Sequence, residues 1–343
     1  RSRSPRRHGA EAAAEAPAAE ANVAELLAEA AACQAEMPPE MQRAQALYEE
    51  ALALEPENPD VLDAFGAFLC EDGDGERARA MLEKSAGLRP DTGPEKFLYL
   101  AQMSSGEEAL GYYERGGEIL RASLARMDAG TPEGSQEDAA AVRRQLARTR
   151  ASIAELFMTD LCDEAEAEER CEAALSSGRE IDAGCLEVLA TTANLRKVQG
   201  RLDEAAEYAL DCARRVTGSI REQFVLCDGE EPAKDLDVLS DEDLVQLCRT
   251  LIDLKKPAEA RELLEVLLEK DEEDIQVWCL LGYCHAVEKD PDGVQECASQ
   301  ATKLCKRLGK ADAALWRGTI RDLAQRAKRL EAAGPAEDEP EEP

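Results

Sequence analysis

The stretch PDVLDAFGAFLCEDGDGERARAMLEKSAGLRP, residues 59–90, decides the fold. Its apolar residues recur at helical spacing in two halves, and a Gly- and Asp-containing turn separates these halves. Gly66 and Ala78 are small, which predicts that the two helices touch at these positions. The larger side chains that would fill the seam between the helices are Leu62, Phe65, Leu69 and Leu82. One hairpin cannot bury its own apolar face, so the sequence predicts stacked copies.

Copies of this pattern recur along the chain. A step back of 34 residues from Ala78, Leu82, Ser85 and Pro90 reaches Ala44, Tyr48, Ala51 and Pro56. Near the other end, Trp278-x-x-Leu281-Gly282-x-x-His285 repeats the first helix of the unit. The spacing resembles the tetratricopeptide repeat. It predicts an all-α tetratricopeptide-repeat superhelical solenoid of about six to seven helical hairpins plus a C-terminal capping helix.

The ends of the chain differ in composition from this central part. Residues 1–21 open with Arg1, Arg3, Arg6 and Arg7 and continue as an Ala-rich run, which we interpret as a disordered arm; a nuclear-import signal is the alternative. Residues 22–330 form the predicted solenoid, with 311–330 as its cap. Residues 331–343 are acidic and contain Pro, and they predict a disordered tail.

The overall charge narrows the class of partner. The 343 residues carry 73 acidic and 41 basic side chains, a formal net charge of −32. Such a charge repels nucleic-acid phosphates and anionic membranes, so we expect no direct nucleic-acid or membrane partner. It attracts basic proteins. The run 228–243 is especially acidic, with eight carboxylates against Lys234.

Twelve cysteines are present, and their spacing does not indicate a disulfide scaffold. The closest pair is Cys279 and Cys284, and Cys171, Cys212 and Cys248 fall on core positions of the repeats. We therefore predict reduced, buried thiols in a cytoplasmic or nuclear protein.

Signals for catalysis are missing from the sequence. It contains two histidines, His8 in the arm and His285 at a packing position, so a catalytic triad has at most one ordered base. Neither a Gly-rich phosphate-binding loop nor metal-ligand spacing occurs. The prediction is a non-enzyme without cofactor or metal.

Functional residues are therefore expected on the first helix of each hairpin, which lines the concave face in tetratricopeptide stacks. The predicted partner-binding positions are Asp60, Asp63, Glu71, Glu155, Asp160, Glu187, Asn194, Glu242, Gln246 and Asp253. Most are acidic, which argues against the clamps for heat-shock carboxylates that need Lys and Arg. An acidic groove suits a Lys/Arg-rich peptide, and the alternative is a solvated surface without a ligand.

Three longer stretches carry a more specific resemblance. GPEKFLYLAQMSSGEEALGYYERGGEILR (93–121), ASIAELFMTDLCDEAEAEERCEAAL (151–175) and PAEARELLEVLLEKDEEDIQVWCLLGYC (257–284) resemble the dedicated assembly chaperones of large-subunit ribosomal protein four. The resemblance covers about residues 22–310. It implies capture of that newly made basic protein, protection from aggregation, and delivery to nuclear pre-60S particles.

Two other classes of function remain open from the residues alone. A generic tetratricopeptide scaffold, for example in RNA processing, would join protein complexes and would tolerate salt. An enzyme with the repeats as a regulatory module would need a second domain, for which the chain offers no segment.

Overall fold

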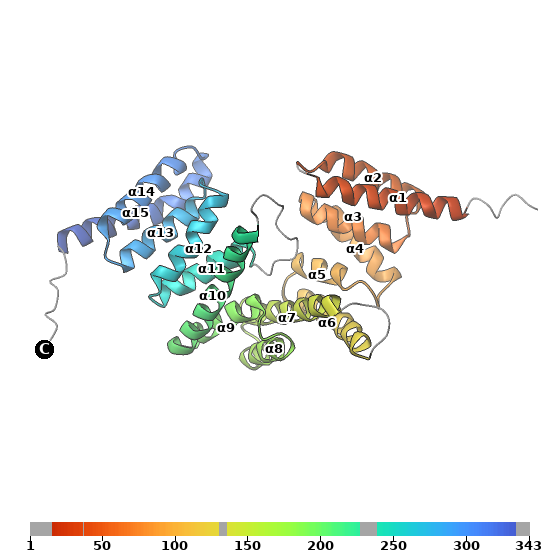
Figure 1. Cartoon of the computed structure of the whole chain (residues 1–343), viewed down its shortest axis with the longest axis horizontal. Coiled ribbons are helices and arrows are strands. Elements are labelled where there is room, and N and C mark those ends of the chain that lie inside the picture. Colours follow the sequence, from red (N-terminus) through yellow and green to blue (C-terminus); the bar gives the residue numbers. More distant parts are fainter. Residues whose placement is uncertain (1–15, 37, 130–135, 227–238, 334–343) are drawn as a thin grey trace, which may run out of the picture. The chain divides into compact units, whose positions relative to one another are not determined.

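The computed structural model describes residues 16–36, 38–129, 136–226 and 239–333 (Figure 1). Within these residues it contains fifteen α-helices and no strand, which confirms the all-α prediction. The chain divides into two compact units, Arg1–Ala174 and Leu175–Pro343, and the boundary falls inside helix α8.

The N-terminal unit is built from helical hairpins. Its helices are α1 (Ala16–Ala35), α2 (Met41–Leu54), α3 (Pro59–Asp72), α4 (Gly75–Leu88), α5 (Pro94–Gln102), α6 (Gly106–Asp128), α7 (Gln136–Met158) and the start of α8 (Ala167–Ile181). The closest packing joins α1 to α2, α3 to α4 and α5 to α6. The first helices of successive hairpins also touch one another, α1 against α3 and α3 against α5.

The C-terminal unit repeats this plan. After α8 come α9 (Leu186–Val198), α10 (Leu202–Leu226), α11 (Asp241–Asp253), α12 (Pro257–Lys270), α13 (Ile275–Val287), α14 (Pro291–Cys305) and α15 (Lys310–Ala333). Helices α9 and α10, α11 and α12, and α13 and α14 form the hairpins. Helix α15 packs against both α13 and α14, as expected of a cap (Figure 1).

Local sequence explains where the hairpin helices begin and end. Asn58 caps α3 by accepting a hydrogen bond from the Asp60 amide at 2.9 Å, and Pro59 occupies the first turn, where no amide is needed. Gly73 ends α3 with a φ of 87°, a left-handed conformation that favours glycine. Asp74 then caps α4 through the Arg77 amide at 3.2 Å.

The seam of this hairpin is as tight as its small residues predict. A Cβ atom built on Gly66 would lie 2.6 Å from Cδ2 of Leu82, so any side chain at this position would have to displace Leu82 from the seam between α3 and α4. Tyr48 of α2, in the preceding hairpin, packs its ring on Phe65 and Phe68 of α3. Its ring centroid lies 5.6 Å from that of Phe65 and 5.3 Å from that of Phe68.

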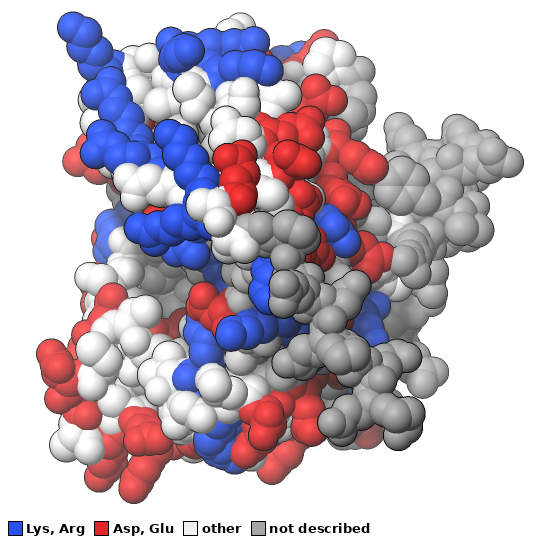
Figure 2. Space-filling model, turned by 90° about the vertical axis from the view of Figure 1, so that its left-hand side faces the viewer, with Lys and Arg blue, Asp and Glu red and all other residues white. Residues whose placement is uncertain are grey.

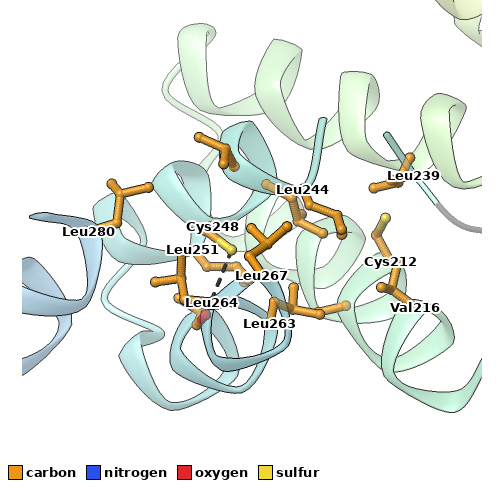
Figure 3. Close-up of a cluster of buried hydrophobic side chains, with 14 of the residues drawn as sticks. Cys212, Val216, Leu239, Leu244, Cys248, Leu251, Leu263, Leu264, Leu267 and Leu280 are labelled. Atoms are coloured by element: carbon orange, nitrogen blue, oxygen red, sulfur yellow. Dashed lines mark hydrogen bonds between the residues drawn. The ribbon is translucent and has the colours of Figure 1, made fainter. Parts of the chain in front are cut away.

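A continuous core holds the C-terminal unit together. Figure 3 shows part of it, where leucines of α11 and α12 surround Cys248 and lie near Cys212 and Val216 of α10. The Cys248 thiol is buried and donates a hydrogen bond to the carbonyl of Ala260, with 3.7 Å between sulfur and oxygen (Figure 3). The expected burial of Cys171, Cys212 and Cys248 is confirmed, and the eleven described cysteines are free thiols.

Helix α10 continues to Leu226, and Val216 and Ile220 extend its buried face into the same core. Of the acidic run, residues 228–238 lie outside the described residues, while Asp241 to Asp243 form the first turn of α11. Residues 1–15 of the basic arm and 334–343 of the acidic tail also lie outside them.

None of the described helices combines the length and the apolar character that a membrane-crossing segment needs.

Candidate functional site

Eight of the ten predicted partner-binding positions lie on first helices of hairpins, and the other two, Glu155 and Asp160, lie at the end of α7. Asp60, Asp63 and Glu71 lie on α3, Glu155 on α7, Asp160 after α7, Glu187 and Asn194 on α9, and Glu242, Gln246 and Asp253 on α11. In each unit, neighbouring first helices contact one another: α3 with α5, and α9 with α11 and then α13. We call these two surfaces the N-terminal and C-terminal first-helix faces.

Asp60 and Asp63 differ in how far they are committed to the fold. Asp60 is exposed and lies 2.5 Å from the Arg89 guanidinium. Asp63 is half-buried and lies 3.4 Å from Nζ of Lys96, whose side chain is completely buried. Asp63 therefore neutralises an internal cation, and its charge is already in use.

Glu71 lines a depression of about 310 Å³ between α3 and α5. Gln34 of α1 donates its side-chain amide to Glu71 at 3.3 Å, so three first helices meet there. Tyr99 forms the opposite wall; burial, and then the nearby Glu71 carboxylate, raises the pKa of its hydroxyl. The remaining lining residues are Cys70, Gly73, Gly75, Gln102 and Met103. This site offers one exposed carboxylate beside a phenol that stays protonated.

The two positions near the end of α7 have different roles. Glu155 is exposed on α7. Asp160 accepts a hydrogen bond from the Gly106 amide at 3.0 Å, and Gly106 has a φ of 57°. Asp160 thus helps to hold the start of α6, a local structural task that sequence spacing could not reveal.

On α9, Glu187 is half-buried and accepts a hydrogen bond from the Cys185 thiol at 3.2 Å. Burial and then this carboxylate raise the pKa of Cys185 to about 12, so the thiol stays protonated at neutral pH. Asn194 is exposed two turns further along the helix.

On α11, the three predicted residues are all exposed. Asp253 pairs with Lys197 of α9, with 3.0 Å between Nζ and Oδ2, which joins two neighbouring first helices. Glu242 and Gln246 lie toward the other end of α11.

A groove of about 600 Å³ continues from Asp253 across α11, α13 and α15. It combines a carboxylate with two guanidinium groups, Arg249 and Arg326, and with the aromatic rings of Tyr283 and Trp316. Its other lining residues are Ile252, Gln276, Cys279, Leu280, Ala286, Val287 and Thr319. The groove is therefore mixed in charge, and apolar side chains form much of its lining.

Of the residues that line this groove, the sequence predicted only Asp253, because it assigned no partner-binding positions beyond α11. The spacing of Gln276, Leu280, Tyr283 and Val287, three or four residues apart, would have indicated one face of α13. A prediction from charge alone would still have missed the apolar residues of its lining.

The described residues contain no group of three or more His, Cys, Asp or Glu side chains placed to hold a metal ion. His285 is engaged inside its hairpin, where Nδ1 lies 2.9 Å from a carboxylate oxygen of Asp290. A Cβ atom on Gly293 would lie 2.3 Å from that Nδ1, so the imidazole fills space between α13 and α14.

Known proteins were compared with the chain. The family model described as "Tetratricopeptide repeat" matches residues 40–95, which include the stretch that decides the fold. A solved structure titled "Assembly Chaperone of RpL4 (Acl4)" is similar with a TM-score of 0.62 and 30% identity, over 77% of this chain and 95% of that one. The chain belongs to the Acl4 family.

Two curated fungal members of the Acl4 family are also similar in sequence, and both are named "Probable assembly chaperone of rpl4". The one from Schizosaccharomyces pombe is 33% identical over 237 residues, which is 68% of this chain and 65% of the relative. The one from Emericella nidulans is 29% identical over 195 residues, 56% of this chain and 43% of the relative. The chain thus spans less than two thirds of either curated relative.

Proposed function

We propose that this chain is a dedicated chaperone that binds newly made large-subunit ribosomal protein four, prevents its aggregation and supports assembly of the 60S ribosomal subunit. The observation that carries the proposal is the match to the solved Acl4 structure over 95% of that chain. The names of the two curated relatives point to the same partner. The mode of action is binding rather than catalysis.

The charge of the chain suits a basic client. A net charge of −32 attracts Lys/Arg-rich segments from a distance, and exposed acids on first helices offer them contacts. Among the predicted positions, the exposed acids on the two first-helix faces are Asp60, Glu71, Glu242 and Asp253. An exposed ion pair contributes only about 0.2–1 kcal/mol, so several must act together and affinity should fall with salt.

The C-terminal first-helix face adds a preference for apolar side chains. The groove beside Asp253 has apolar walls from Ile252, Leu280 and Val287, and it can bury an aliphatic side chain of the client. The segment that fits best is therefore extended and basic, with apolar residues between its cations. A segment held in this way would be kept from non-specific binding to RNA.

The proposed task also sets where the protein works. A chaperone that meets its client at synthesis and releases it at nuclear pre-60S particles operates in both cytoplasm and nucleus. Fluorescence microscopy of a tagged full chain, with nuclear export blocked, tests this: the expected result is nuclear accumulation.

A pull-down with the full chain from lysate, with RNA digested and bound proteins identified by mass spectrometry, tests the proposal. The expected result is strong enrichment of ribosomal protein four over other ribosomal proteins. Equal recovery of many ribosomal proteins would leave only a non-specific polyanion. Recovery of an unrelated complex instead would favour a tetratricopeptide scaffold.

A further inference from the structure

The C-terminal end of this acidic chain is locally basic. Between Lys303 and Arg329 there are nine Lys and Arg residues and only two acids, Asp312 and Asp322. Figure 2 looks onto the side of the molecule where Figure 1 places α14 and α15, and Lys and Arg side chains gather in its upper left part. The sign of the charge is therefore reversed over this part of the C-terminal unit.

Four of these cations form a line on the outer surface of α15. Lys310, Arg317, Arg321 and Lys328 are all exposed. At 3.6 residues per turn they lie within about 40° of one another around the helix axis, and they extend over about 27 Å of its length. We call these four residues the basic stripe.

The fold does not use the basic stripe. Ile320, Leu323 and Ala327 attach α15 to the core from another side of the helix. Among the described residues, none of the four stripe cations takes part in an ion pair or a side-chain hydrogen bond, whereas the neighbouring Arg326 pairs with Asp322 at 2.6 Å. The stripe is thus a row of free charges on a helix that is anchored elsewhere.

The residues between the stripe cations limit what can bind there. Ala314, Gly318 and Gln325 are small or polar, so the surface allows close approach but provides no apolar centre. Leu315, which is 76% exposed, lies about 140° away from the stripe around the helix axis. A typical protein interface has an apolar core and an amphipathic membrane helix inserts apolar side chains, whereas a phosphate backbone needs only cations within reach.

We propose that the basic stripe binds the phosphate backbone of RNA. This inference goes beyond client binding; only the choice of RNA over DNA rests on the proposed function, because a ribosome-assembly factor works among RNA. The net charge of −32 argued against a nucleic-acid partner, but at physiological salt charges are screened beyond about 8 Å. At contact the local cations decide the sign of the interaction.

The expected binding is weak and independent of base sequence. No aromatic side chain lies on the stripe to stack a base, so contacts go to phosphates. With four phosphate contacts, affinity should fall about 100-fold between about 50 and 200 mM salt. RNA binding here would hold the chaperone near its assembly site while the first-helix faces carry the client.

Fluorescence anisotropy with the full chain and a labelled RNA duplex of about 20 base pairs measures this binding. The test variant carries Arg317→Gln, Arg321→Gln and Lys328→Gln. A matched variant loses the same charge at exposed cations elsewhere, through Arg121→Gln, Arg214→Gln and Lys289→Gln. Thermal melting by circular dichroism confirms that both variants remain folded.

The stripe variant should lose at least about tenfold in affinity at about 50 mM salt, and its affinity should fall only about fourfold between the two salt concentrations. The matched variant should bind like the unchanged chain, and client capture should persist in all three. Equal weakening in both variants, or no RNA binding at low salt, would overturn the proposal. Tighter binding of polyglutamate than of RNA would assign the stripe to an acidic protein, and clear preference for a DNA duplex would exclude RNA as the target.

Discussion

The Nζ atom of Lys96 lies 3.4 Å from Oδ2 of Asp63, and the lysine side chain is completely buried while the aspartate is 27% exposed. The hydroxyl of Ser85 accepts a further hydrogen bond from Lys96 at 3.2 Å. Removal of one partner of such a pair leaves a buried charge without compensation. We therefore expect Asp63→Asn to lower the free energy of unfolding by about 3 kcal/mol, measured by urea denaturation.

Asp60→Asn is the matched control for this prediction. Asp60 lies three residues away on the same helix, but its side chain is 67% exposed and pairs with the Arg89 guanidinium at the surface. Its loss should change stability by less than about 1 kcal/mol. Equal effects of the two substitutions would show that Asp63 does not compensate Lys96. If Asp63 is needed for folding, a loss of client capture after charge reversal at Asp63 would not separate an effect on binding from an effect on folding.

The contact between Gly66 and Leu82 predicts a second effect on stability. Gly66→Leu should destabilise the protein by about 1–3 kcal/mol or more, because the new side chain has no room between α3 and α4. Gly87 on α4 has no atom within 4 Å of a built Cβ, so Gly87→Leu should be neutral or stabilising by up to about 1 kcal/mol. An unchanged urea midpoint for the Gly66 variant would contradict the helix register.

The buried thiols predict a loss of stability at alkaline pH. Burial raises the pKa of the Cys248 thiol above the value of about 8.5 that it has in an unfolded chain. The folded state therefore keeps a proton that the unfolded state loses. The contribution of Cys248 to the free energy of unfolding is therefore fully present below about pH 8.5. Above that pH it falls by up to about 1.4 kcal/mol per pH unit.

Urea unfolding at several pH values between about 8 and 10 checks this slope. Cys248→Ala should make the slope shallower, whereas Cys162→Ala, at an exposed thiol, should leave it unchanged. Identical slopes in all three proteins would show that Cys248 ionises in the folded state. Reducing agent should leave stability unaltered, because the described cysteines are free.

The fourth prediction concerns client capture by the first-helix faces. Reversal of Asp60, Glu71, Glu242 and Asp253 to Lys should abolish capture of ribosomal protein four in the pull-down, because it replaces attraction with repulsion. The matched control reverses four exposed acids on second helices, Glu50, Glu76, Glu265 and Glu269. Both variants change the net charge equally, so equal loss of capture would mean that overall charge, and not the first-helix faces, selects the client.

The repeat architecture could be predicted from the sequence alone. Gly66 and Ala78 mark the contact between two helices, and the same spacing returns 34 residues earlier at Ala44. These signals are local, because helix packing within one hairpin depends on residues only a few turns apart. The sequence also placed eight of the ten partner-binding positions on first helices of hairpins, since helical position follows from the register.

The tertiary structure alone decided what those positions do. Asp63 meets Lys96 from the next hairpin, and Asp160 meets the Gly106 amide 54 residues away, so both charges serve the fold. The groove beside Tyr283 and Trp316 forms only where α11, α13 and α15 come together. Periodicity specifies which face of a helix a residue lies on. The partner of a charged side chain depends on residues from neighbouring hairpins, and the spacing of residues along the sequence does not specify which of them come into contact.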